Sequence, residues 1–205
     1  MCIIQRTLFY SSFKKDGKLD TEKSSREKLL KAIREKAYRT GDFTLASGQK
    51  SDYYIDLKEV TLDAEGGLMI GKVIFAAIRD WGAQAVGGME LGSVPTSTAV
   101  CIVSAIEGEP VANFIVRKQA KGHGAGKRLE GNVGAGTKVV VVEDVVSTGG
   151  SSVKAIGALR EAGAEVIGVV SIVDREMGGR EAFGEMDVRY EPIFTVSDVR
   201  YYRPS

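Results

Sequence analysis

The feature that most constrains the fold is an alternation of short, almost wholly apolar segments with amphipathic ones. Apolar segments that read as buried strands lie at 111–116 (VANFIV), 137–144 (TKVVVVED) and 165–175 (EVIGVVSIVDR), and polar or helical segments separate them. Strands that are apolar on both faces are typical of a parallel sheet covered by helices on both sides. The sequence therefore predicts a doubly wound α/β fold, whose ligands bind beyond the carboxyl ends of the strands.

The other segments fit this pattern. The spacing of apolar residues predicts helices over 24–41, 63–81, 94–108 and 151–164, and further strands over 83–90 and 189–199. Segment 43–60 has turn residues between two strand-like pieces and predicts a hairpin. A chain of 205 residues is expected to form one domain, over 21–205, and residues 1–20 differ enough in character to be an N-terminal extension.

Charge and cysteine content exclude several classes of function. The net charge is +1, so no overall field favours nucleic acid or an acidic membrane surface, and the apolar runs are shorter than a membrane span. Cys2 and Cys101 offer neither a disulfide framework nor a zinc-ligand spacing. We therefore expect a cytoplasmic protein without nucleic-acid or membrane partners, whose anion sites are local.

Residues 139–150 (VVVVEDVVSTGG) join a buried strand to a turn suited to anions. The segment STGGSS (147–152) follows this strand and opens a helix, so free backbone N–H groups, two glycines and several hydroxyls come together. A phosphate monoester needs such groups at a helix N-terminus. A glycine turn with a serine cap is the alternative. The chain has no P-loop motif and no dinucleotide fingerprint after its first strand.

Glu143 and Asp144 stand directly before this turn. If the phosphate of a sugar phosphate lies on the turn, both carboxylates are placed to accept hydrogen bonds from ribose hydroxyls. They are also placed to stabilise positive charge that develops on the ribose. A solvated acidic strand end is the alternative. Adjacent strand residues point to opposite faces, so we do not expect this pair alone to hold a metal.

Segment 117–128 (RKQAKGHGAGKR) concentrates positive charge and glycine. This combination suits a mobile lid over a highly anionic substrate such as a diphosphate, although a solvated loop is the alternative. His123 is the only histidine, lies between glycines and lacks zinc-ligand partners. We interpret it as a ligand of, or proton donor to, a leaving diphosphate. The segment has no interleaved aromatics, which disfavours nucleic-acid binding.

Taken together, these motifs resemble a known family. VVVVEDVVSTGGSS resembles the signature with which type I phosphoribosyltransferases bind 5-phosphoribosyl 1-diphosphate (PRPP). Segments 43–58 (FTLASGQKSDYYIDLK), 116–131 (VRKQAKGHGAGKRLEG) and 173–179 (VDREMGG) resemble orotate phosphoribosyltransferases in particular. The resemblance runs from about Ser24 to the end of the chain and implies a type I fold with a small N-terminal hood.

The resemblance also implies a reaction, in which PRPP and orotate give orotidine 5′-monophosphate and diphosphate, with Mg²⁺ bound mainly through PRPP. Lys121, His123 and Asp144 would be the catalytic residues, and Ser147 and Arg175 would bind orotate. The basic loop would reach the active site of a second subunit, which implies a homodimer. The implied PRPP-binding residues are Arg117, Lys118, Lys121, His123, Glu143, Asp144, Val145, Val146, Ser147, Thr148, Gly149, Gly150 and Ser151.

Three positions depart from the family pattern. Ala46 and Leu91 stand where relatives often have lysines, and Glu143 stands where aspartate is frequent. The basic loop is therefore expected to carry more of the diphosphate charge. Phosphoribosyl transfer to another base, or PRPP sensing by a regulator of the same fold, are the alternative functions. Arg175 favours orotate, because a neutral purine has no carboxylate for a guanidinium to bind.

Overall fold

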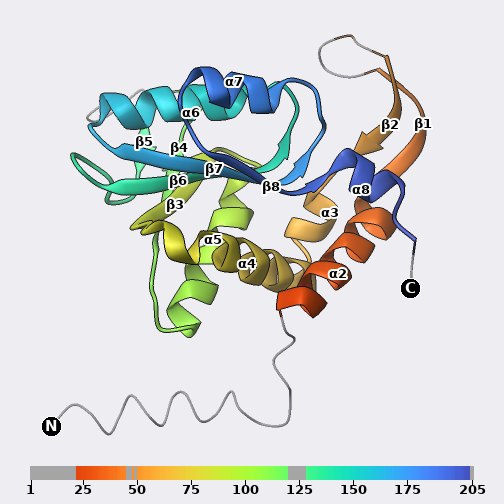
Figure 1. Cartoon of the computed structure of the whole chain (residues 1–205), viewed down its shortest axis with the longest axis horizontal. Helices are drawn as coiled ribbons and strands as arrows, with labels where there is room; N and C mark the ends of the chain where they lie inside the picture. Colours follow the sequence, from red (N-terminus) through yellow and green to blue (C-terminus); the bar gives the residue numbers. More distant parts are fainter. Residues whose placement is uncertain (1–21, 45–47, 49, 120–127, 204–205) are drawn as a thin grey trace, which may run out of the picture.

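A six-stranded sheet forms the centre of the computed structural model, which describes residues 22–44, 48, 50–119 and 128–203. The strand order is β5-β4-β3-β6-β7-β8, and only the β4–β5 pair is antiparallel (Figure 1). The strands are β3 (Ala85–Met89), β4 (Ala112–Val116), β5 (Leu129–Glu130), β6 (Lys138–Val146), β7 (Glu165–Asp174) and β8 (Tyr190–Thr195). The predicted α/β fold with a parallel sheet is confirmed.

Helices cover both faces of this sheet because β6 is apolar on both. Val140 and Val142 belong to the core on the side of α4 and α5, whereas Val139 and Val141 pack into the core on the side of α6 and α7. Figure 1 shows these two layers above and below the sheet. The helices are α2 (Glu22–Ala32), α4 (Ala64–Ile78), α5 (Ser93–Ile106), α6 (Gly150–Glu161) and α7 (Gly179–Glu185).

The order of the strands fixes where a ligand can bind. After β3 the chain adds β4 on one side, and β6 then pairs with β3 on the other side. The connections that leave β3 and β6 thus diverge beyond the carboxyl ends of these strands. Open α/β sheets bind their ligands in the crevice at such a switch point. The segments after Met89 and Val146 meet there.

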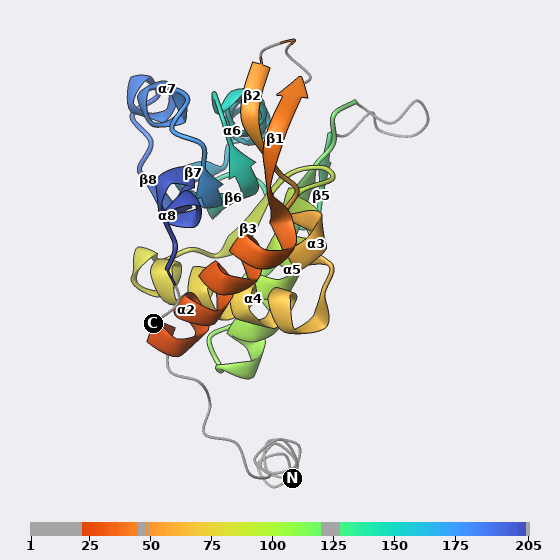
Figure 2. The same ribbon diagram turned by 90° about the vertical axis from the view of Figure 1, so that its right-hand side faces the viewer.

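A separate two-stranded sheet forms the predicted hood. Strands β1 (Tyr38–Thr44) and β2 (Lys50–Ile55) pair antiparallel, and the rings of Tyr38 and Tyr53 stack at 5.7 Å. The short helix α3 (Lys58–Thr61) then leads to α4. Figures 1 and 2 show that this hairpin stands apart from the main sheet. The turn at 45–47, with Ala46, lies outside the described residues.

Two predicted elements end in the wrong place. The helix predicted over 24–41 continues only to Ala37, its last turn being a π-helix from Ile33, because Tyr38 already pairs in the hairpin. The strand predicted over 189–199 stops at Thr195. There the Thr195 and Asp198 side chains form a capping box that starts helix α8 (Val196–Arg200). The pattern Thr-Val-Ser-Asp was the signal for this cap.

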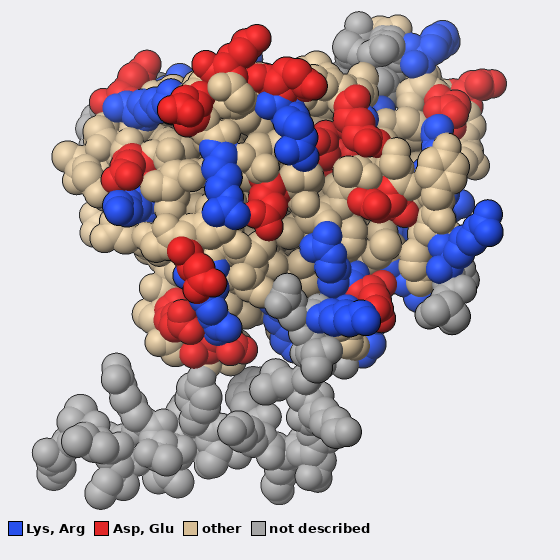
Figure 3. Space-filling view, viewed as in Figure 1, with Lys and Arg blue, Asp and Glu red and all other residues tan. Residues whose placement is uncertain are grey.

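Surface charges are mixed, as the net charge of +1 suggests. Figure 3 shows basic and acidic side chains interspersed over the visible face. Within the described ranges, no helix combines the length and the hydrophobicity that a membrane crossing requires. Residues 1–20 lie outside those ranges, so the boundary between an extension and the domain stays a prediction.

Candidate active site

The predicted anion site is a cavity at the N-terminus of α6. Gly149, at φ +78°, is the N-cap residue and has no side chain that could accept from the first helical N–H groups. These donors and the positive end of the helix dipole are therefore available to an anion. The cavity measures about 350 Å³ and is lined by Glu143, Val145, Val146, Ser147, Thr148, Gly149, Gly150, Ser151, Ser152 and Lys154.

Close packing against α7 fixes this loop. The start of α7 lies so near that a Cβ atom on Gly179 would overlap the Val146 side chain and approach the Ser147 carbonyl oxygen to 3.1 Å. A Cβ on Gly149 would come within 3.0 Å of the Phe183 ring. The glycines of STGGSS and VDREMGG thus serve one contact, in which two loops approach more closely than larger residues allow.

The two adjacent carboxyl groups have different surroundings. Glu143 is only 7% exposed and accepts a 3.4 Å hydrogen bond from Ser152 Oγ. Burial, with a contribution from neighbouring Asp144, raises the pKa of Glu143 to about 8, so this carboxyl group is mostly protonated at neutral pH. Protonation removes the like-charge repulsion that two adjacent carboxylates would otherwise create.

Asp144 points away from the phosphate cavity, toward the connection after β3. One of its oxygens accepts from its neighbour's backbone, Val145 N–H, at 2.8 Å. A Cβ atom added to Gly92 would lie only 2.6 Å from the same oxygen. Asp144 is half-buried, whereas Glu143 is buried. Of the two, Asp144 is therefore the more accessible to a sugar bound between β3 and β6.

Arg175 is positioned by the hood. It directly follows β7, its backbone N–H donates to Val146 O at 2.8 Å, and its Nε donates to Tyr53 Oη at 3.1 Å. The guanidinium also lies 4.8 Å from the centre of the Tyr53 ring. Tyr54 points elsewhere and packs on Phe43 at 5.6 Å. The fold thus brings Tyr53 and Arg175 together but leaves Tyr54 43% exposed on the other side of the hairpin.

A second arginine fixes the same tyrosine. Arg200 binds both carboxylate oxygens of Asp52, at 2.8 and 2.9 Å, donates to Tyr38 Oη, and lies 5.1 Å from the centre of the Tyr53 ring. These contacts fasten the hairpin to α8. They were not predicted, because the paired residues are 148 positions apart in the sequence.

The described ends of the basic loop are joined at its base. Arg117 N–H donates to Arg128 O at 2.8 Å, Lys118 N–H donates to a Glu90 carboxylate oxygen at 2.8 Å, and Arg117 forms a 3.6 Å ion pair with Glu130. The loop therefore starts beside the turn after β3. Lys121 and His123, both predicted to be catalytic, lie outside the described residues.

Lys154 is a site residue that sequence reasoning missed. It lines the phosphate cavity one helical turn after Gly150, where its ammonium group adds positive charge. The spacing of four residues from the glycine pair was the signal. In the described part of the chain, no group of three or more histidine, cysteine or acidic side chains could hold a metal ion.

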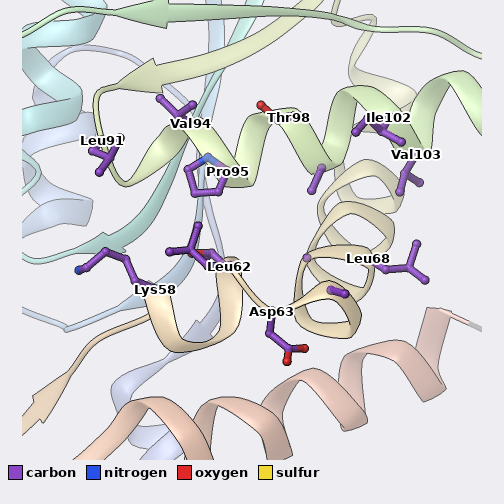
Figure 4. Close-up of a pocket in the computed structure, with 14 residues that line it drawn as sticks. Lys58, Leu62, Asp63, Leu68, Leu91, Val94, Pro95, Thr98, Ile102 and Val103 are labelled. Atoms are coloured by element: carbon purple, nitrogen blue, oxygen red, sulfur yellow. The ribbon is translucent and has the colours of Figure 1, made fainter.

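A second cavity, of about 610 Å³, lies between α3, α4 and α5. We call it the α3–α5 groove. Leu62 and Leu91 line it and are 72% and 68% exposed, and the lining residues Leu68 and Ile102 are exposed as well. Figure 4 shows Lys58 and Leu91 at one end of the groove, and Leu68, Ile102 and Val103 at the other. An apolar surface of this kind typically marks an interaction site.

Comparisons with known proteins agree with the geometry. The phosphoribosyl transferase domain family matches residues 92–195. Orotate phosphoribosyltransferase from Nostoc sp. is 47% identical over 176 residues, which cover 85% of each chain. The Aquifex aeolicus enzyme is 42% identical over 85% of this chain and 97% of its own. The crystal structure of Mycobacterium tuberculosis orotate phosphoribosyltransferase in complex with PRPP superimposes with a TM-score of 0.73 at 33% identity, over 86% of this chain and 99% of that one.

Proposed function

We propose how this site works from one premise, that the chain belongs to the orotate phosphoribosyltransferase family. The reaction transfers the 5-phosphoribosyl group of PRPP to orotate, which gives orotidine 5′-monophosphate and diphosphate for pyrimidine synthesis. The observation that carries the assignment of substrates is the pairing of a phosphate cavity at α6 with a guanidinium, Arg175, beyond the adjacent strand.

The phosphate cavity would hold the 5′-phosphate of PRPP. Backbone N–H groups of 150–152, the hydroxyls of Ser147, Thr148 and Ser151, and Lys154 are the donors that line it. The ribose would then extend toward Asp144, whose carboxylate accepts from ribose hydroxyls. The same negative charge stabilises the oxocarbenium-like ribose that forms as diphosphate leaves.

Arg175 would bind the carboxylate of orotate. A planar guanidinium matches a planar carboxylate in two parallel hydrogen bonds, and the contact with Tyr53 restricts its orientation. Ser147 stands at the end of the phosphate loop and, by its family position, would contact the orotate ring. Only Nε of Arg175 is engaged by Tyr53 in the hydrogen bonds described, so the two terminal nitrogens can face the substrate.

The basic loop would supply the charge that the leaving diphosphate needs. Arg117 and Lys118 stand at its described base, and we propose that Lys121 and His123 bind the diphosphate and that His123 can protonate it. Mg²⁺ would arrive bound to the phosphate oxygens of PRPP as part of the substrate, since such oxygens are its preferred ligands.

A spectrophotometric assay tests the proposed function. We expect loss of orotate absorbance when the protein is mixed with orotate, PRPP and Mg²⁺, and no loss when PRPP is omitted. Adenine and hypoxanthine serve as alternative acceptors in parallel reactions. Turnover with either purine but not with orotate would refute the assignment of orotate.

We further propose that the active unit is a homodimer, with the α3–α5 groove as the surface covered by a second copy. Leu91 is one of its most exposed apolar residues and directly follows Glu90, which holds the base of the basic loop. A second copy bound at this groove would therefore lie beside the basic loop. The family resemblance implies that this loop enters the active site of the second copy. Burial of the exposed leucines supplies a hydrophobic driving force for association.

Mixed dimers test the action of the loop in trans. Lys121→Ala and Arg175→Ala should each be nearly inactive alone. If the loop acts in trans, a mixed dimer contains one site with both defects and one intact site. Random subunit exchange should therefore restore about a quarter of wild-type activity, because half of the dimers are mixed. Absence of any gain, with mixed dimers confirmed by mass spectrometry, would show that the loop acts within its own subunit. Ile102→Asp, in turn, should shift sedimentation toward the monomer.

A further inference from the structure

The turn after β3, residues 90–93, carries no cationic side chain. With the 5′-phosphate on α6, carbon 1 of the ribose lies beyond Asp144, toward the turn after β3. The side chains at that turn are Glu90 and Leu91, one acidic and one apolar. A leaving diphosphate needs positive charge close to its oxygens. This argument rests on the proposed function, in particular on the placement of the 5′-phosphate.

Lys58 is a cation that the mechanism above does not use. It is the first residue of α3 and lines the α3–α5 groove at the same end as Leu91. Figure 4 shows its amine directed toward that end, away from Leu68 and Ile102. Asp144 is near enough for its charge to act on Lys58. Lys58 thus stands near the turn after β3, on the short helix that follows the hood.

Asp56 holds this lysine in place. Lys58 Nζ lies 2.6 Å from Asp56 Oδ1, and the same oxygen accepts from Lys58 N–H at 3.1 Å. The hydrogen bond that the Lys58 ammonium group donates to Asp56, with a smaller effect of the Asp144 charge, raises the pKa of Lys58, so the amine stays protonated. An ammonium group has three donors, and Asp56 occupies one of them. The side chain is half exposed, so the others can reach a ligand.

We propose that Lys58 is a further PRPP-binding residue, whose ammonium group donates to oxygens of the diphosphate beside Asp144 and Leu91. The aspartate clamp keeps the lysine oriented at the groove end while leaving two N–H groups for the substrate. Lys58 thereby provides positive charge from α3 at a turn whose described side chains carry none.

Lys58→Gln tests this role. A hydrogen bond to a charged group contributes about 1.5–3 kcal/mol, so we expect PRPP affinity, measured by calorimetry with Mg²⁺ and without orotate, to fall about tenfold or more. The KM for orotate should change much less, and Lys58→Arg should recover most of the PRPP affinity. Wild-type affinity of Lys58→Gln for PRPP would overturn the proposal, provided that the wild type turns over orotate. Failure of the wild type would instead refute the proposed function.

Lys36 provides a matched control. It too is half exposed and pairs with an aspartate, Asp63, at 3.2 Å, but it does not line either cavity. Lys36→Gln should leave PRPP binding unchanged. Equal losses in both glutamine variants, or a shift of Lys58→Gln alone to the monomer, would mean that Lys58 acts on folding or association and not on PRPP.

Discussion

The two ends of the site are constructed differently. The end proposed to bind phosphate consists of residues 143–154, a single stretch that runs from β6 through the loop into α6. We call it the phosphate end. The end proposed to bind orotate, which we call the orotate end, joins Arg175 to Tyr53, 122 positions away, and is fastened by Arg200 and Asp52. A local motif can form one end without the hood, whereas the other end exists only when the hairpin has docked.

The two ends also differ in the groups that supply their positive charge. The phosphate end uses backbone N–H groups at a helix N-terminus. The helix already holds these groups in place, so binding a ligand there costs no side-chain conformational entropy. The orotate end uses long side chains, whose guanidinium groups are ordered on aromatic rings at 4.8 and 5.1 Å. We therefore expect the two ends to respond differently to substitution. Substitutions in the hood should weaken the binding of orotate, and substitutions around α6 should weaken the binding of PRPP.

The largest effect is expected for Arg175→Ala. Loss of a charge-assisted contact with a carboxylate costs about 2–5 kcal/mol, so kcat/KM for orotate should fall by about a hundredfold while the affinity for PRPP changes little. Steady-state kinetics with each substrate varied in turn measure the two effects. Arg180→Ala, at a neighbouring arginine that lies over Tyr190, is the control. An equal loss of affinity for PRPP would contradict the separation of the two ends.

An intermediate effect is expected for Gly179→Ala. The added methyl group would overlap the Val146 side chain, so the phosphate loop must shift, at a cost of roughly 1–3 kcal/mol. The KM for PRPP should rise several-fold, and the melting temperature should fall. Gly184→Ala on the same helix is the control, because nothing lies within 4 Å of its Cβ position. Equal behaviour of the two variants would show that this contact does not shape the loop.

A further effect is expected for Glu143→Gln and concerns the pH dependence of stability. Between the ordinary pKa of 4.5 and the folded value of about 8, the folded protein holds a proton that the unfolded chain has lost. The free energy of unfolding of the wild type should therefore decrease as the pH rises through this range. Glutamine does not titrate, so the variant should gain stability relative to the wild type from pH 5 to pH 8. Melting temperatures that run parallel over this range would show that Glu143 is ionised in the fold.

The cavity at the start of α6 could be predicted because its signals are adjacent in the sequence. The apolar run ending at Val142 identifies a buried strand, and the glycines and hydroxyls after Val146 identify the start of a helix. All the predicted loop residues from Val145 to Ser151 line the cavity that the structure shows. Lys121 and His123 stay predictions, since they lie outside the described residues.

The state of Glu143 could not be predicted in this way. Its sequence context suggested a charged pair with Asp144, but burial in the folded chain raises the pKa of Glu143, and the hydrogen bond from Ser152 of α6 only partly opposes this effect. The end of the first helix likewise depends on residues far from it in the sequence. Tyr38 adopts a strand conformation because it pairs with Ile55 and its ring stacks on Tyr53. Lys58 gave no signal, since a lysine in a helical turn is usually only a solvated side chain.

The sequence by itself determined the parallel sheet, the loop that follows β6 and the family of the chain, because backbone periodicity and a contiguous motif are local properties. Only the tertiary structure decided which carboxyl group is buried, which tyrosine holds Arg175 and which lysine lies at the end of the α3–α5 groove beside Leu91. These properties depend on distances between residues far apart in the chain. Such distances, and the desolvation that accompanies them, are set by packing of the hood and helices against the sheet.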